Sequence, residues 1–262
     1  MAAATDPVLI ARDGGIVTVT LNRPEKLNAL DTASWDRVRA AFESLDADGD
    51  VRCVILTGAG GKAFCVGADI AEFDQVRSSA DKARAYAKRI HPAIESIASC
   101  RHPVVAAVRG LCVGGGLELA CMADLRICGE SSRFGIPVKR LGLVVAYAEL
   151  RPLVHLVGPA NAKQILLEGE IFGAGEALRM GLVNRAVPDA RFDEEVLAMA
   201  RRIAEGAPLV ARWHKKFTDR LLDPRPLTPA EDDESYHCFD TEDFQAGRKA
   251  FLAKVAPQFK GR

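Results

Sequence analysis

Two apolar segments that each lead into a glycine-rich turn constrain the fold of this chain most strongly. Residues 51–57 (VRCVILT) and 103–109 (PVVAAVR) are mostly apolar, which is typical of strands buried on both faces of a parallel sheet. Glycines follow the first strand at 58–61 and the second at 114–116. Shorter strand and helix patterns lie between them, so a unit of strand, strand and helix recurs roughly every 50 residues. The sequence therefore predicts an α/β fold built from repeated ββα units.

Further elements are predicted on either side of these strands. Residues 16–21 (IVTVTL) alternate as a half-buried strand does, and a short strand is expected at 124–128. Asp31 stands in the N-cap position of a helix with one apolar face, formed by Trp35, Val38, Phe42 and Leu45. A second helix is expected over 81–100, with Pro92 as a potential kink.

Strand patterns end near residue 205, and the remainder is helical by pattern. We therefore predict a core over residues 1–205, which carries the site, and a helical oligomerisation region over 206–262, with a boundary near Gly206. Such a tail cannot bury its aromatic rings alone, so we expect it to pack on a neighbouring subunit; the rings belong to Phe239, Phe244, Phe251 and Phe259.

Composition excludes several classes of function. The 35 lysines and arginines balance 35 aspartates and glutamates, so the chain has no broad charge for binding nucleic acid or a membrane surface. No uncharged run approaches the ~20 residues that span a bilayer. The five histidines are scattered without metal-ligand spacing, and Ser131 and Ser132 lie in no nucleophile motif. We therefore expect no nucleic-acid or membrane partner, no metal site and no serine nucleophile.

The cysteines indicate a reducing compartment. The chain has seven, an odd number, with no CxxC pair, and most stand inside apolar runs. The first residues lack the basic lead and apolar stretch of a signal peptide. We expect a cytoplasmic protein, or a protein of an organelle matrix if an import sequence has been removed.

The three glycines before Glu118 are the clearest signal of chemistry. Glycines at a strand-to-helix turn leave backbone N–H groups unobstructed, so that they can hold an anion or a developing oxyanion. The same glycines also permit close packing of a helix on a sheet. Glu118 is charged among apolar neighbours, where burial would raise its pKa toward the range of a general acid or base. Its alternative role is to stabilise the start of the helix.

A second loop, from Gly58 to Ile70, offers similar backbone groups at Gly67 and Ala68. It has a weak dinucleotide-binding pattern at its start, but no amphipathic helix follows, and we reject that interpretation. Asp69 is expected to cap a short helix there.

Six segments, in this order and spacing, resemble the enoyl-CoA hydratase/isomerase (crotonase) family. They are NRPEKLNAL (22–30), KAFCVGADI (62–70), GLCVGGGLELA (110–120), FGIP (134–137), EALRMGLVN (176–184) and FLAK (251–254). The resemblance implies a crotonase-like spiral of ββα repeats with a helical C-terminal trimerisation region, and a homotrimer or a homohexamer of two trimers. It also implies an acyl-CoA substrate, with coenzyme A entering as part of the substrate and no separate cofactor.

The resemblance also implies roles for individual residues. The N–H groups of Ala68 and Gly115 are expected to bind the thioester oxygen, and Glu118 to act as the catalytic acid/base. The residues expected along the coenzyme A path are Lys26, Leu27, Ala29, Val66, Asp69, Ile70 and Gly114, with Phe251 and Lys254 reaching coenzyme A, often across a subunit boundary.

One departure from the family pattern leaves the reaction open. Hydratases of the family carry a second glutamate immediately after the proline of the FGIP segment, where this chain has Val138, and the glycine-rich stretch that follows is altered over 143–149. Glu118 then works alone in hydration, or Glu149 or Tyr147 replaces the missing group. Alternatively, the chain is an enoyl-CoA isomerase, an acyl-CoA decarboxylase, or a CoA-ester binder that has lost catalysis.

Overall fold

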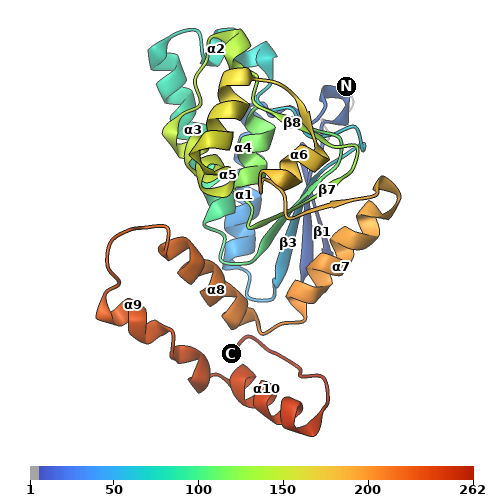
Figure 1. Ribbon diagram of the computed structural model, residues 1–262, viewed down its shortest axis with the longest axis vertical. Coiled ribbons are helices and arrows are strands. Elements are labelled where there is room, and N and C mark those ends of the chain that lie inside the picture. Colours follow the sequence, from blue (N-terminus) through green and yellow to red (C-terminus); the bar gives the residue numbers. More distant parts are fainter. Residues whose placement is uncertain (1–5) are drawn as a thin grey trace.

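Ten β-strands and ten α-helices are found along residues 6–262, the part of the chain that this computed structural model describes (Figure 1). The strands are β1 (Val8–Asp13), β2 (Ile16–Leu21), β3 (Cys53–Gly58), β4 (Ala63–Cys65), β5 (Val104–Val108), β6 (Leu111–Val113), β7 (Leu125–Gly129), β8 (Arg133–Gly135), β9 (Phe172–Gly173) and β10 (Arg185–Val187). The α-helices are α1 (Thr32–Ala47), α2 (Phe73–Val76), α3 (Ala80–Ala98), α4 (Gly115–Cys121), α5 (Tyr147–Glu168), α6 (Ala174–Arg179), α7 (Phe192–Ala204), α8 (Pro208–Arg220), α9 (Pro229–Glu234) and α10 (Glu242–Ala253). Short 3-10 helices include η1 (Pro24–Lys26), η2 (Ile70–Glu72) and η3 (Val138–Leu141).

The strands form two sheets that the chain visits alternately. Six strands lie in the order β1-β2-β3-β5-β7-β10, parallel except for the β1–β2 hairpin. The other four lie in the order β4-β6-β8-β9, with β9 antiparallel to β8. Each pair β3/β4, β5/β6 and β7/β8 thus gives one strand to each sheet. This confirms the predicted α/β fold of repeated units.

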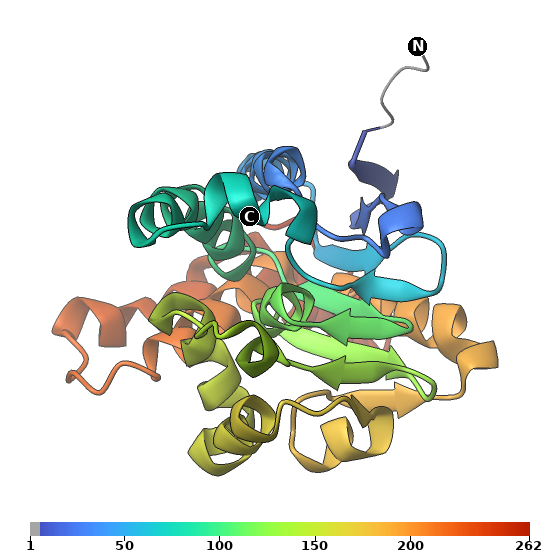
Figure 2. The same ribbon diagram turned by 90° about the horizontal axis from the view of Figure 1, so that it is seen from above.

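The central strands β3 and β5 of the larger sheet are largely apolar because helices cover both faces. Successive side chains along a strand point to opposite faces of the sheet, so they pack against different helices. One face, which includes Val54, Leu56, Val104 and Ala106, lies in the same core cluster as residues of α1 and α3. The opposite face, which includes Cys53, Ile55, Val105 and Ala107, packs against Phe192, Val196, Met199 and Ala200 of α7. Figures 1 and 2 show α1 and α3 side by side, with α7 on the other side of the sheet.

Local signals fix where several helices begin. The Asp31 side chain accepts a hydrogen bond from the Ser34 N–H at 2.8 Å, which confirms the predicted N-cap of α1. The Asp69 side chain accepts from the Ala71 N–H at 3.1 Å and caps η2, as expected. Strand β1 has no sequence signal of its own, since only Val8 of its six residues is buried. Among the described helices, none is both long and apolar enough to cross a bilayer.

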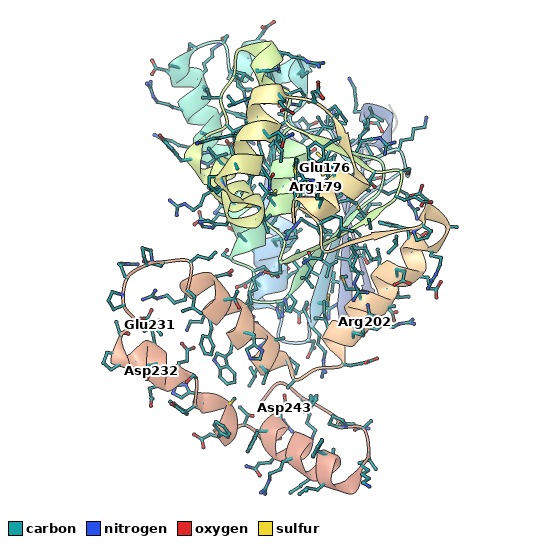
Figure 3. All side chains as sticks on the ribbon, in the orientation of Figure 1. Glu176, Arg179, Arg202, Glu231, Asp232 and Asp243 are labelled. Atoms are coloured by element: carbon teal, nitrogen blue, oxygen red, sulfur yellow. The ribbon has the colours of Figure 1, made fainter. Side chains whose placement is uncertain are left out.

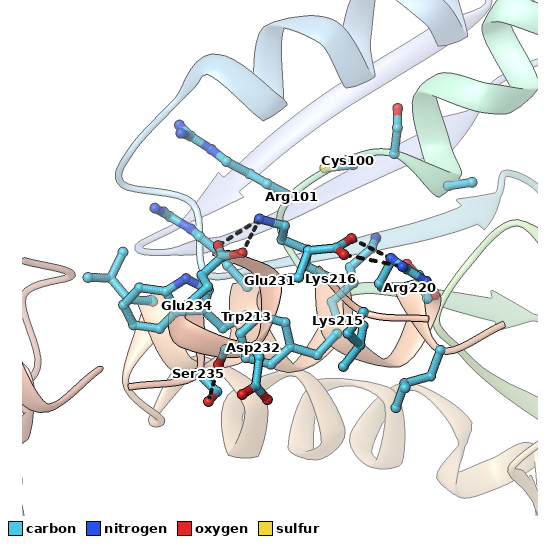
Figure 4. A pocket seen from close by; sticks show the side chains of 18 residues that line it. Cys100, Arg101, Trp213, Lys215, Lys216, Arg220, Glu231, Asp232, Glu234 and Ser235 are labelled. Atoms are coloured by element: carbon cyan, nitrogen blue, oxygen red, sulfur yellow. Dashed lines mark hydrogen bonds and ion pairs between the residues drawn. The ribbon is translucent and has the colours of Figure 1, made fainter. Parts of the chain in front are cut away.

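The last three helices leave the core and form a separate layer (Figure 1). Helix α7 ends at Ala204 and α8 begins at Pro208, on either side of the expected boundary. Asp243 of α10 is buried and accepts hydrogen bonds from the Lys260 and Gly261 N–H groups at 2.6 and 2.8 Å, which ties the end of the chain to this helix (Figure 3). A cavity of about 780 Å³ lies between α8, α9 and the end of α3 (Figure 4).

Lys215 connects this layer to the core. Its ammonium group lies 3.0 Å from the Asp124 carboxylate and donates to the His102 carbonyl at 3.3 Å. Burial raises the pKa of Asp124, and Lys215 opposes that shift. The tail is therefore joined to the core through a largely desolvated ion pair.

Lys215→Met is expected to lower the free energy of unfolding by about 1–3 kcal/mol, because it leaves the partly buried Asp124 charge without its cation. Urea unfolding measures the change. Lys216→Met is the matched control, since Lys216 is an exposed neighbour that pairs with Glu234 (Figure 4), and it should cost less than about 1 kcal/mol. Equal losses in the two variants would contradict this role for Lys215.

Candidate active site

Two backbone turns from different repeats meet at the amino end of α4. The chain before η2 is held beside the residues before α1, because the Leu30 N–H donates to the Gly67 carbonyl at 2.8 Å and the Asp69 N–H donates to the Leu30 carbonyl at 2.9 Å. On its other side, Gly67 lies against Gly115: a Cβ atom at Gly67 would stand 2.8 Å from the Gly115 nitrogen. The turns at 66–69 and 114–118 are therefore in contact.

Glycine is required at this contact for two reasons. Gly67 has a φ of +95°, which side-chain-bearing residues rarely adopt, and has no room for a methyl group. At Gly116 an added Cβ would lie 2.1 Å from the Cys65 carbonyl oxygen, so α4 packs directly on the backbone of β4. The glycine run thus serves close packing and, at the same time, opens the turn; the two interpretations of the sequence do not exclude each other.

The N–H groups of Ala68 and Gly115 have no protein acceptor within the described residues, whereas those of the preceding residues, Gly67 and Gly114, do. The Gly67 N–H faces the Cys65 sulfur at 3.3 Å, and the Gly114 N–H donates to the Gly135 carbonyl at 2.8 Å. Gly115 is the first residue of α4, where a helix has no internal acceptor for its N–H. Each of the two turns in contact therefore presents an unpaired donor, Ala68 on one and Gly115 on the other.

Glu118 lies next to these donors. The position that a Cβ at Gly115 would occupy is 3.6 Å from the Ala68 nitrogen and also 3.6 Å from Oε2 of Glu118. The carboxyl group and the Ala68 amide thus border the same point. Burial and, to a smaller extent, the negative charge of Glu149 raise the pKa of Glu118 to about 8, and Arg77 opposes the shift. A carboxyl group that titrates near neutral pH suits general acid/base work.

The residues proposed as replacements for the missing glutamate take different positions. Tyr147, the first residue of α5, is 88% exposed. Glu149, two residues later, is buried at 8% exposure, and its carboxylate accepts the Ala146 N–H at 2.8 Å. Val138 of η3 packs on the apolar core. Glu149 is therefore the only one of these side chains to lie near Glu118 with an acidic group.

Most residues expected along the coenzyme A path lie together. Arg23 organises them: its guanidinium donates to the Ala29 carbonyl at 2.6 Å and to the Asp69 carboxylate at 3.0 Å. Leu27 and Asn28 have positive φ values, and the buried Asn28 amide donates to the carbonyl of Ala63 at 2.8 Å. This brings the predicted residues of the first segment beside those of the second; they are Lys26, Leu27 and Ala29, and Val66, Asp69 and Ile70.

Two predicted residues lie elsewhere in the single chain. Phe251, which is 84% exposed, and Lys254 stand at the end of α10, in the outer layer of helices (Figure 1). Their role toward coenzyme A from a neighbouring subunit stays a prediction.

Sequence reasoning missed three side chains that shape the site. Arg77 follows α2 and lies over the rings of Phe73 and Tyr86, with its charge acting on Glu118. His91 of α3 lies 3.4 Å from Glu149. Neither has a sequence signal, because both come from helices that reach the site only through packing. Arg23 lies in the NRPEKLNAL segment, which was identified as a family motif, but no role was predicted for Arg23 itself.

Comparisons with the sequences and structures of known proteins indicate the same family. A family model described as enoyl-CoA hydratase/isomerase matches residues 11–262. The short-chain-enoyl-CoA hydratase of Clostridium acetobutylicum is 32% identical over 249 residues, which cover 94% of this chain and 95% of the relative. The crotonyl-CoA hydratase of Syntrophomonas wolfei is 33% identical, with 98% of each chain covered. The crystal structure of an enoyl-CoA hydratase/carnithine racemase from Magnetospirillum magneticum superposes with a TM-score of 0.97 at 48% identity, covering 99% of this chain and 97% of that one.

Proposed function

Because this chain belongs to the enoyl-CoA hydratase/isomerase family, we propose that it adds water across the 2,3 double bond of an enoyl-CoA thioester. One observation carries the proposal: the unpaired Ala68 and Gly115 N–H groups and the Glu118 carboxyl group lie beside one another where the two turns meet. Donors fixed in advance stabilise a charge that develops during reaction. The acyl group of the substrate would place its thioester oxygen at these donors.

The chemistry follows from this arrangement. As the water oxygen bonds to the β carbon, a water O–H bond breaks and a second base takes its proton, while the electron pair of the double bond moves to the thioester oxygen, which becomes the enolate oxygen held by Ala68 and Gly115. Glu118, whose pKa is raised to about 8, is protonated at neutral pH and delivers a proton to the α carbon as the enolate collapses. Coenzyme A arrives with the substrate, and no further cofactor takes part. The cysteine content supports a cytoplasmic location.

The test is hydration of crotonyl-CoA and longer enoyl-CoA esters, followed as loss of the conjugated double bond. Hydration by the wild-type protein would support the proposal. If the protein binds these esters without hydrating them, and instead shifts the double bond of a 3-enoyl-CoA or decarboxylates a carboxyacyl-CoA, the alternative reactions replace hydration. Binding without any turnover would indicate a CoA-ester binder.

We further propose that the protein assembles as a homotrimer or as a hexamer of two trimers. Large apolar side chains are exposed on the outer helices, where nothing in the single chain covers them; they include Phe239, Phe251, Leu252 and Val255. Residues 206–262 would form this assembly region, and residues 1–205 the core with the site.

Sedimentation at micromolar concentration is expected to show trimers or hexamers and no monomer. Leu252→Glu, at a residue that is 75% exposed, should shift the distribution toward smaller species because it places a charge on the apolar surface. A wild-type protein that sediments as a monomer would refute the assembly.

A further inference from the structure

We infer that Glu149 is the second acid/base carboxylate of this site and that His91 is its positioning residue. The inference rests on the proposed function and deepens it, because hydration requires a base for the water as well as an acid for the α carbon. The family's residue for this task is absent, since its place is taken by Val138.

The geometry of Glu149 fits this role. Its side chain comes from the first turn of α5, which packs against α4, the helix that carries Glu118. The side chain is buried, yet Oε2 has a single backbone donor, the Ala146 N–H at 2.8 Å, and no lysine or arginine is paired with it in the described chain. A buried carboxylate that is neither neutralised by a cation nor fully hydrogen-bonded is costly to the fold unless it has a use.

His91 lies beside the other oxygen. Its Nε2 atom is 3.4 Å from Oε1 of Glu149, is itself buried, and makes no hydrogen bond within residues 6–262. The contact joins α3 to α5 and involves the carboxylate oxygen that the Ala146 N–H does not bind. We therefore assign His91 to positioning, since it acts through Glu149.

Titratable and charged groups lie around Glu149 on several neighbouring elements. Glu118 faces it from α4 and His91 from α3, while Arg77, which follows α2, acts on Glu118. On η3, the Lys139 ammonium is bonded to the Leu167 carbonyl at 2.9 Å. The negative charge of Glu149 raises the pKa of Glu118, so this charge favours the protonated form of Glu118.

In the proposed step, one carboxyl group accepts a proton and the other donates one. As the water oxygen bonds to the β carbon, an O–H bond of the water breaks and its proton passes to the Glu149 carboxylate. The π electrons move to the thioester oxygen, and the enolate then takes the proton of Glu118 at the α carbon. Proton transfer from Glu149 back to Glu118 restores both groups, so no external acid or base is consumed.

The decisive experiment separates the two carboxyl groups. Wild-type protein, Glu149→Gln, Glu118→Gln and the exposed control Glu168→Gln, on the same helix, are assayed for crotonyl-CoA hydration and for exchange of the α protons of butyryl-CoA with deuterated solvent. Exchange breaks only the α C–H bond and needs Glu118 but no water addition. We expect Glu149→Gln to lose about 10²–10⁴-fold in kcat for hydration while it retains exchange, Glu118→Gln to lose both, and Glu168→Gln to lose neither.

Two further readouts distinguish a chemical role from a structural one. Removing the Glu149 charge lowers the pKa of Glu118, and exchange requires the ionised Glu118 that removes the α proton, so the acidic limb of the pH–rate profile for exchange should move to lower pH in Glu149→Gln. Adding Val138→Glu to Glu149→Gln should restore at least about a tenfold gain in hydration, because it returns a carboxylate to the family position. His91→Gln should lower kcat for hydration with little change in KM.

The outcomes that overturn the inference are specific. Hydration unchanged in Glu149→Gln removes Glu149 from the reaction, and loss of both hydration and exchange assigns it to the structure alone. A wild-type protein that exchanges α protons but hydrates no enoyl-CoA contradicts the proposed function itself, which is a different result.

Discussion

Glu118→Gln is expected to lower kcat for hydration by about 10²–10⁴-fold, with a much smaller change in KM. The amide keeps the shape of the side chain, but it cannot give a proton to the α carbon. In the wild type, the rate should fall as pH rises through about 8, the pKa of Glu118, because the acid form is then lost. Steady-state kinetics between about pH 7 and pH 9, roughly one unit either side of this pKa, check both results.

The same substitution should raise stability at alkaline pH. The pKa of Glu118 is higher in the folded protein than its usual value of 4.5, so the wild type loses stability as pH rises from 4.5 toward about 8. Glutamine does not titrate, so the variant does not lose this stability as pH rises. Unfolding curves near the two ends of this range should therefore show a variant that gains on the wild type as pH increases.

Glu176→Gln serves as the control for a lost carboxylate. Glu176 lies on α6 and is bonded to Arg179 (Figure 3), and Arg179 holds the pKa of Glu176 below its usual value. This variant should keep the wild-type kcat. Unchanged turnover in Glu118→Gln would remove Glu118 from the mechanism.

Gly67→Ala is expected to lower kcat by about 10²–10³-fold, the effect of losing one oxyanion donor. The added methyl group would stand 2.8 Å from the Gly115 nitrogen, which is a backbone atom, so the two turns must move apart. The Ala68 and Gly115 N–H groups would then no longer point at one oxygen. Kinetics with crotonyl-CoA and the affinity for a saturated acyl-CoA measure the loss.

A substitution at a second glycine tests the effect of backbone strain alone. Gly14 also has a positive φ, +58°, but a Cβ there would meet nothing within 4 Å. Gly14→Ala should therefore lower stability by roughly 1–2 kcal/mol and leave kcat unchanged. If both variants lose only stability, the contact between the turns has no part in catalysis.

Much of the site could be anticipated because its parts are local. The glycines that open a turn, the N-cap at Asp69 and the charge of Glu118 in an apolar helix are all readable within a few residues. The second sheet was harder to predict, since β4, β6 and β8 have three residues each and are too short for a clear periodicity. Choosing between Tyr147 and Glu149 was impossible from spacing, because the choice depends on the rotation of α5 against its neighbours.

The sequence by itself determined the repeated ββα units and the family, and it predicted Glu118 as the acid/base, since each rests on short segments of chain. Only the tertiary structure decided that Gly67 contacts Gly115 across two repeats, that Tyr147 faces solvent, and that His91 stands beside Glu149. The reason is that these contacts join residues some 50 apart, which come together through sheet pairing and helix packing and leave no local pattern.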